Sequence, residues 1–222
     1  MLPIARRQKV TRVLEGAVLA NLFFEASTRT RVSFGAAFCR LGGSVCDTTG
    51  FTFSSMAKGE SIHDTSRVIA GYADAIVVRH PEQGAVAEFA RATNVPVVNG
   101  GDGPGEHPTQ ALLDLYTIQR EFSRLGKRVD GAHVALVDRV CKPDVVVMHP
   151  LPRDSRAGAH DLATDLDGDP RLAIFRQTDN GIPVRMAIFA SLLGVDGLVQ
   201  RSMRNASWTP PVHIGPEDSL VD

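Results

Sequence analysis

Short apolar segments alternate with segments of helical pattern along the first half of the chain. The apolar segments are typical of strands and occupy 18–24 (VLANLFF), 44–49 (SVCDTT), 74–80 (DAIVVRH) and 95–101 (VPVVNGG). The predicted helices occupy 31–43, 61–72, 82–93 and a stretch that begins near Pro108. A parallel connection needs a crossover that is usually a helix, so this alternation predicts an α/β fold in which helices flank a parallel sheet.

Polar clusters directly follow three of the predicted strands. They are Ser27–Arg31, Arg79–His80 and Asp102–His107. In sheets of this kind, ligands bind beyond the carboxyl ends of the strands. We therefore expect the three clusters to converge on one site.

The alternation breaks in the second half of the chain. Two further predicted strands, 133–138 (HVALVD) and 144–149 (DVVVMH), are separated only by RVCKP. A parallel crossover needs about a dozen residues. These strands either form a hairpin, or a crossover and more have been removed here. A predicted helix over 181–194 follows, and the tail 205–222 is expected to be irregular.

Composition narrows the classes of function. The chain of 222 residues is 43% hydrophobic and has a net charge of −1, which argues against broad nucleic-acid binding and makes any anion site local. The apolar run 17–24 is too short to span a bilayer, so we expect no membrane insertion. Three cysteines without metal spacing favour a reducing, cytoplasmic location, and the scattered histidines predict no metal site.

The cluster Ser27–Arg31 has the composition of an anion site. It lies between a predicted strand and a predicted helix, where free N–H groups and the helix dipole favour an anion. Hydroxyl groups add donors, and arginine offers a planar fork to phosphate oxygens. The alternative is an ordinary helix N-cap with solvated arginines.

The other two clusters allow two interpretations each. Arg79 ends a strand and either reaches into a cleft or lies on the surface. His107 is placed to donate a proton or polarise a carbonyl, with Gln110 one turn further on, or it is a plain polar loop residue. The glycines around Pro104 have the wrong spacing for a dinucleotide-binding loop.

Two loops complete the set of candidates. Lys58 in SSMAKGES (54–61) is either a lid lysine that closes over an anionic substrate or part of an exposed loop. The segment HPLPR (149–153) follows a predicted strand. Its prolines fix backbone carbonyls that suit an amide-like ligand, and a plain turn is the alternative.

Six motifs occur together in one order, and their combination resembles the aspartate/ornithine carbamoyltransferase family over roughly residues 12 to 200. The motifs are FFEASTRTRVSF, SSMAKGES, VVRHP, GDGPGEHPTQALLDLYTI, MHPLPRDS and DNGIPVRMA. The ornithine enzymes usually carry a cysteine within HCLP and lack the lysine loop. Pro150 and Lys58 therefore favour the aspartate branch.

The resemblance implies transfer of the carbamoyl group from carbamoyl phosphate to L-aspartate, giving N-carbamoyl-L-aspartate and phosphate in pyrimidine biosynthesis. It implies no cofactor and no metal. The implied catalytic residues are His107, Arg79, Thr30 and Lys58. The implied carbamoyl phosphate ligands are Ser27, Thr28, Arg29, Thr30, Arg79, His107, Gln110, Pro150, Leu151 and Pro152. The lid residues Ser54 and Lys58 would reach into a neighbouring subunit, which implies a homotrimer with shared sites.

The chain departs from the family between Val137 and Asp144, where roughly one small domain's worth of residues, about a hundred, is absent. The absent part includes the arginines that hold the aspartate carboxylates in the family, and the N-terminus is shortened. We expect a carbamoyl-phosphate-binding domain over 1–129 and, over 130–222, a truncated second α/β domain whose last helix returns to the first. The L-aspartate site is then incomplete.

Three interpretations follow from this departure. The chain is an enzyme by descent with severely reduced turnover, a non-catalytic assembly subunit, or an incomplete sequence of a full-length enzyme. Binding of regulatory or dihydroorotase-like chains is left open by the sequence.

Overall fold

The computed structural model describes residues 1–50, 58–130, 145–154, 156, 161–162 and 164–208. The chain divides into two compact units, and each is described by itself. The first comprises Met1–Ala111 and Ile182–Pro211, and the second comprises Leu112–Gly181 and Val212–Asp222. The predicted domain boundary after residue 129 stays a prediction.

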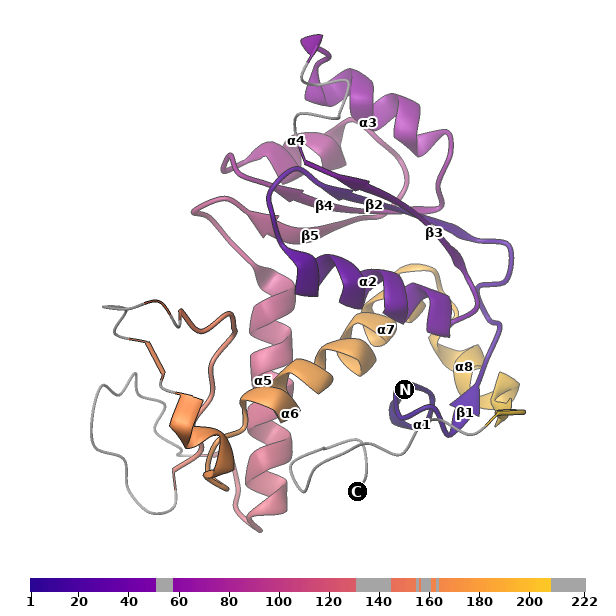
Figure 1. The fold of residues 1–222 in the computed structure, drawn as a ribbon. Coiled ribbons are helices and arrows are strands. Elements are labelled where there is room, and N and C mark those ends of the chain that lie inside the picture. Colours follow the sequence, from indigo (N-terminus) through magenta and orange to yellow (C-terminus); the bar gives the residue numbers. More distant parts are fainter. Residues whose placement is uncertain (51–57, 131–144, 155, 157–160, 163, 209–222) are drawn as a thin grey trace. The chain divides into compact units, whose positions relative to one another are not determined.

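A four-stranded parallel sheet forms the centre of the first unit (Figure 1). Its strands are β2 (Val18–Phe23), β3 (Ser44–Thr49), β4 (Ala75–His80) and β5 (Val97–Asp102), in the spatial order β3-β2-β4-β5. The register pairs Phe23 with Arg79 and His80 with Asp102, so the carboxyl ends of β2, β4 and β5 are neighbours. The four strands predicted in the first half of the chain and the α/β fold class are confirmed.

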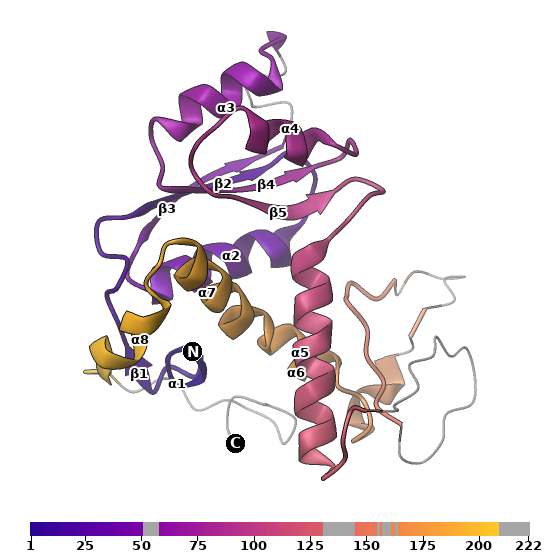
Figure 2. The ribbon, with the colours of Figure 1, turned by 180° about the vertical axis from the view of Figure 1, so that it is seen from behind.

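Helices cover both faces of this sheet (Figures 1 and 2). The helices are α2 (Thr28–Arg40), α3 (Ile62–Ala70), α4 (Ala85–Arg91) and α7 (Gly181–Leu192). Alternating strand residues supply two cores: Leu19 and Val77 pack with α2 and α7, whereas Leu22 and Val78 pack with α3 and α4. The period-2 pattern thus builds the two layers that hold the strand ends in place.

Residues far apart in the sequence complete the first unit. The ring of Phe189 on α7 makes edge contacts with Phe34 and Phe38 on α2, at centroid distances of 5.9 and 5.0 Å. The short strand β1 (Lys9–Val10) pairs antiparallel with β6 (Arg204–Asn205). The remaining helices of this unit are α1 (Leu2–Ala5) and α8 (Asp196–Ser202). Neither α8 nor the β1–β6 pair was predicted.

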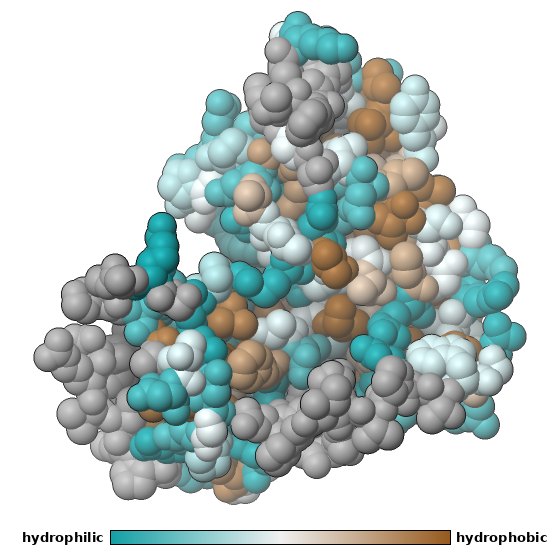
Figure 3. Space-filling view, in the orientation of Figure 1, coloured by the Kyte–Doolittle hydropathy of each residue, from teal (hydrophilic) through white to brown (hydrophobic). Residues whose placement is uncertain are grey.

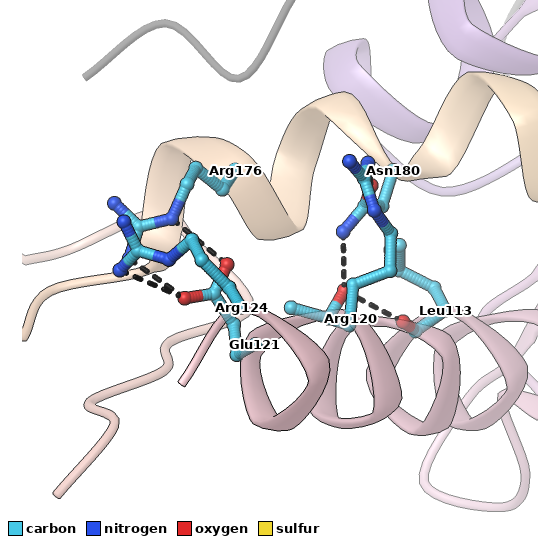
Figure 4. Close-up of polar contacts among 7 residues, drawn as sticks. Leu113, Arg120, Glu121, Arg124, Arg176 and Asn180 are labelled. Carbon is cyan, nitrogen blue, oxygen red and sulfur yellow. Dashed lines mark hydrogen bonds and ion pairs between the residues drawn. The ribbon is translucent and has the colours of Figure 1, made fainter. Parts of the chain in front are cut away.

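The second unit is built on two helices joined by buried polar contacts (Figure 4). They are α5 (Pro108–Arg124), whose first turn lies in the first unit, and α6 (Ile174–Asp179). Arg176 on α6 donates two hydrogen bonds, of 2.9 and 3.0 Å, to the buried carboxylate of Glu121 on α5. Asn180 donates to Thr117 at 3.1 Å and accepts from Arg120 at 2.8 Å. A short 3-10 helix, η3 (Thr164–Gly168), precedes α6.

Three differences from the predicted elements stand out. The strand prediction at 144–149 is wrong for the described residues 145–149, because only Val147 forms a bridge, to Leu172. The predicted strand 133–138 lies outside the described residues. Helix α2 begins at Thr28, three residues before the predicted start, so Thr28–Thr30 form its first turn.

The described part of the chain contains no single helix that is both long enough and apolar enough to cross a membrane. One pair, Ile174–Leu192 with Asp196–Ser202, meets the length and composition criteria together but bends by 117°. Figure 3 shows that apolar residues on the visible face are interrupted by hydrophilic ones.

Candidate active site

The first turn of α2 is open to an anion. Ser27 occupies the N-cap position, but its side chain makes no capping hydrogen bond, and no acidic residue lies in the first turn. Helix α3 is different, because Ser61 accepts a hydrogen bond of 3.0 Å from the Asp64 N–H. The backbone donors at the start of α2 therefore lack the side-chain acceptor that usually satisfies them. This geometry argues against the simple N-cap interpretation of Ser27.

Arg79 is held at the end of β4 by its neighbours. Its Nε atom lies 2.9 Å from Glu25 Oε2, within ion-pair distance although not in hydrogen-bonding geometry. Its Nη1 donates to the Gly100 carbonyl at 3.2 Å. The β4–β5 register shifts between Val78 and His80, so Arg79 lies at a local irregularity of the kind that redirects a side chain.

Gly101 makes room for this arginine. Its φ of +133° is one that side-chain-bearing residues rarely adopt, and an added Cβ would lie 2.6 Å from Arg79 Nη1. The glycine cluster that superficially resembled a dinucleotide loop thus has a different physical role. Gly101 allows the backbone of β5 to approach the guanidinium group of Arg79 closely.

His107 lies directly before α5, and its ring is a neutral imidazole at pH 7. Burial, as the largest cause, and the positive charges of Arg79 and Arg185 together lower the pKa of His107 to about 4. Thr109 Oγ1 lies 3.4 Å from its Nδ1. A neutral imidazole can donate a hydrogen bond to a carbonyl oxygen without carrying a charge into the site.

Arg185 on α7 was missed by the sequence analysis. It is only 4% exposed, and its guanidinium carbon lies 4.7 Å from the centroid of the Phe34 ring. Burial lowers the pKa of Arg185 to about 10. Its position within the apolar run GIPVRMAIFASLLG was the available signal, since a single arginine in such a run is buried with the helix.

Arg79 and His80, neighbours in sequence, lie on different sides of the sheet. His80 is buried, its Nδ1 accepts from the Glu82 N–H at 3.1 Å, and its ring lies 5.5 Å from that of Phe24. Asp102 caps α4 by accepting from the Gly84 N–H at 2.9 Å. Of these strand-end residues, Arg79 therefore joins His107, while His80 and Asp102 support the fold.

The remaining candidates fall in three groups. Ser27 and Thr30 are half-buried and Thr28 and Arg29 exposed, while Gln110 is half-buried in the first turn of α5. Lys58 is exposed, and Ser54 lies outside the described residues. Pro150, Leu151 and Pro152 belong to the second unit, so the structure brings together only the candidates of the first unit.

Within the second unit, hydrogen bonds hold the loop that contains Pro150, Leu151 and Pro152. The His149 N–H donates to Gln177 at 2.9 Å, and His149 Nδ1 accepts from the Leu151 N–H at 2.9 Å. His149 Nε2 also lies 3.0 Å from Asp161. The loop is therefore fixed through His149 rather than through its prolines alone.

Comparison with known proteins identifies both halves of the chain. The family model "Aspartate/ornithine carbamoyltransferase, carbamoyl-P binding domain" matches residues 2–120, and "Aspartate/ornithine carbamoyltransferase, Asp/Orn binding domain" matches residues 128–192. The aspartate carbamoyltransferase catalytic subunit of Dichelobacter nodosus is 46% identical over 288 residues, which cover 87% of this chain and 83% of the relative. That of Archaeoglobus fulgidus is 56% identical over 134 residues, covering 60% of this chain and 44% of the relative.

A solved structure gives the same result. Aspartate transcarbamoylase from Trypanosoma cruzi, in complex with carbamoyl phosphate and aspartate, matches with a TM-score of 0.68 and 31% identity. The match covers 82% of this chain and 85% of that chain.

The aligned lengths also measure the internal gap. The Dichelobacter match runs over 288 positions, but 87% of this 222-residue chain is only about 193 residues. About 95 positions of the relative thus have no counterpart here, in agreement with the break between the predicted strands. The shared motifs, the two family models and the extent of these matches show that this chain belongs to the aspartate/ornithine carbamoyltransferase family, on its aspartate branch.

Proposed function

We propose that the first unit of this chain binds carbamoyl phosphate, and that its turnover with L-aspartate is severely reduced because the aspartate site is incomplete. The observation that carries the proposal is the uncapped first turn of α2, which shares the strand ends with Arg79 and with a neutral His107. Such an arrangement offers donors and positive charge to a phosphate, and a neutral donor to the adjoining carbonyl.

The family reaction assigns a step to each group. The N–H groups of the first turn, the hydroxyls of Ser27, Thr28 and Thr30, and the guanidinium groups of Arg29 and Arg79 hold the phosphate. His107 donates to the carbamoyl oxygen and stabilises the negative charge that develops there. The aspartate amine attacks the carbamoyl carbon and the C–N bond forms. The bond between that carbon and the phosphate oxygen breaks, and the departing phosphate takes the proton that the amine loses. In this proposal, the carbamoyl amide is bound by Gln110 and by the backbone of Pro150, Leu151 and Pro152.

The chain lacks part of the binding site for the second substrate, L-aspartate. The family arginines that hold both aspartate carboxylates belong to the segment that is absent here. Each charge-assisted hydrogen bond to a carboxylate contributes about 1.5–3 kcal/mol. Loss of both sets of contacts therefore weakens aspartate binding by several orders of magnitude.

The test measures binding and turnover separately on the purified 222-residue protein. Isothermal titration with inorganic phosphate should show binding, carbamoyl phosphate should compete for the same site, and Arg79→Gln should weaken both. Formation of carbamoyl-aspartate should be at least about a thousandfold slower than with a full-length relative, following the loss of both carboxylate contacts. A rate equal to that of the relative, or failure of the wild-type protein to bind phosphate, contradicts the proposal.

A homotrimer with shared sites is the assembly that we propose. Lys58 is exposed, as a residue that acts on a neighbouring subunit must be. Sedimentation equilibrium should give three times the monomer mass of 23.9 kDa. Mixing with a full-length relative whose lid lysine is replaced should restore part of that relative's activity. A monomer mass by sedimentation together with no restored activity contradicts the proposal. The cytoplasmic location and the regulatory or dihydroorotase-like partners stay predictions.

A further inference from the structure

Arg185 is a buried positive charge that lacks a counter-charge in the described part of the chain. Its side chain makes no hydrogen bond and no ion pair with the described residues, and its Nε is buried without an acceptor. Its one recorded contact is with the face of the Phe34 ring, 4.7 Å from the guanidinium carbon. An aromatic face attracts a cation but accepts none of its five N–H donors in the way an oxygen does.

Such an arrangement is costly unless an anion completes it. A buried charge without a partner is disfavoured far more than a buried apolar group of the same shape. Among the described residues of the first unit, no carboxylate pairs with Arg185.

The surroundings of Arg185 are those of the anion site. Phe34 lies on α2, whose first turn carries the uncapped donors. His107 experiences the positive charge of Arg185 together with that of Arg79. Arg185 thus belongs to the same cluster as the groups already assigned to the phosphate.

The charge balance of that cluster favours a further cation beside Arg29 and Arg79. A phosphate monoester carries a charge between about −1.5 and −2 at pH 7. Arg79 already lies against Glu25, which neutralises much of its charge before any ligand arrives. Arg29 is exposed to solvent, which screens its charge, so an unpaired buried arginine adds a positive charge that neither Glu25 nor water offsets.

We propose that Arg185 is a further binding residue of the site, whose guanidinium hydrogen-bonds an oxygen of the bound phosphate group. The inference rests on the proposed phosphate-binding function and extends it to a residue of the motif DNGIPVRMA that the sequence analysis left without a role. It also explains why Arg185 is kept in an apolar environment without a partner. The bound anion is that partner.

The test compares Arg185→Met with Arg40→Met. Methionine keeps much of the length and the packing against Phe34 but removes the charge. Arg40 is a half-buried arginine in the last turn of α2, away from its open first turn. Isothermal titration with inorganic phosphate should show about 10- to 100-fold weaker binding for Arg185→Met, as expected for a lost charge-assisted hydrogen bond, and unchanged binding for Arg40→Met.

Urea unfolding without ligand separates binding from a structural role. Because Arg185→Met removes an uncompensated buried charge, the ligand-free variant should be as stable as the wild-type protein or more stable. A marked loss of stability would mean that Arg185 has a structural role in the ligand-free protein, and would overturn the inference. Unchanged phosphate affinity in Arg185→Met would also overturn it, while leaving the proposed function intact.

A measurement on the wild-type protein makes the test independent of any variant's folding. Addition of phosphate should shift the NMR resonance of the Arg185 Nε–H and slow its exchange with water. Absence of both changes at saturating phosphate contradicts the inference. Failure of the wild-type protein to bind phosphate at all contradicts the proposed function as well.

Discussion

The Nε atom of Arg79 lies 2.9 Å from Oε2 of Glu25, so the arginine at the strand end is oriented before any ligand binds. The Gly100 carbonyl fixes the other side of the guanidinium, and Gly101 leaves the space that it occupies. A group held in place in advance loses less conformational entropy when it binds an anion. Affinity for phosphate should therefore depend on the residues that hold Arg79 as well as on Arg79 itself.

Gly101→Ala should weaken phosphate binding. The new Cβ would lie 2.6 Å from Arg79 Nη1 and would displace the guanidinium. We expect a loss of about tenfold or more in phosphate affinity by isothermal titration, comparable to the loss of a charge-assisted hydrogen bond. Gly16→Ala is the matched control, because Gly16 also has a positive φ but nothing lies within 4 Å of its added Cβ. Equal affinities for the two variants would mean that Arg79 does not need this clearance.

Ser27→Ala should weaken phosphate binding without affecting stability, whereas Ser61→Ala should lower stability without affecting phosphate binding. Ser27 caps nothing, so its removal should leave the free energy of unfolding unchanged and weaken phosphate binding. Ser61 caps α3 through the Asp64 N–H, so its removal should cost about 0.5–2 kcal/mol of stability and leave phosphate binding unchanged. Urea unfolding and phosphate titration on both variants check the pair. A stability loss in Ser27→Ala would restore the simple N-cap interpretation.

His107 should titrate near pH 4 in the ligand-free protein and at a higher pH with phosphate bound. Burial and the charges of Arg79 and Arg185 lower its pKa to about 4, and a bound anion offsets both charges. NMR titration of the ring protons measures both values. A ligand-free pKa at the ordinary value near 6.5 would contradict the buried, cation-flanked environment.

The lowered pKa of His107 also determines how this residue makes the stability of the protein depend on pH. Because the pKa of His107 is lower in the folded protein than in the unfolded chain, the unfolded chain binds more protons between the two values. Its contribution to stability is therefore complete above about pH 6.5 and is lost as the pH falls toward about 4. The wild-type protein should therefore lose unfolding free energy relative to His107→Gln when the pH is lowered from 7 to 5.

Glu121→Ala should strongly destabilise the second unit. The carboxylate is buried and accepts two hydrogen bonds from Arg176, whose side chain is 11% exposed. Breaking a buried pair leaves an uncompensated charge and costs about 3–5 kcal/mol. Arg124→Ala is the control, because this half-exposed arginine lies 3.3 Å from the same carboxylate, and such contacts contribute about 0–1 kcal/mol.

Hydrogen exchange in α5 and α6 provides the measurement for both variants, because it reports the second unit separately. A similar loss of protection in Glu121→Ala and Arg124→Ala would mean that burial does not distinguish the two partners of Glu121.

The regular part of the fold was predictable because its side chains repeat with the period of the structure. Strands β2 and β4 carry apolar residues on both faces and are recognisable as buried runs, and α5 follows an amphipathic pattern. The two-residue strands β1 and β6 have no such period, since they are defined by pairing between distant parts of the chain. The apolar run before His149 resembles a strand, but Val147 pairs with only one residue.

The candidate site was predictable where its residues follow strands, and less so where they meet through space. Ser27 and Arg79 were visible as polar residues directly after apolar runs. The ion pair of Glu25 and the clearance at Gly101 depend on the register of the strands, which a single sequence does not give. Arg185 lies in the motif DNGIPVRMA, 75 residues after Gln110, and only the fold brings it to His107.

The pairing of β1 with β6, with Phe189 packed between Phe34 and Phe38, closes the first unit on itself across the whole described sequence. Residues Leu112–Gly181 of the second unit form an insertion between the two segments of the first unit, and this insertion is a detour in the chain. An in-frame loss confined to the detour spares every strand and every core helix around the anion site. A premature stop at the same point would remove α7, and with it Phe189 and Arg185. Evolution or engineering could therefore shorten or exchange the second unit, while the first unit keeps its own hydrophobic core.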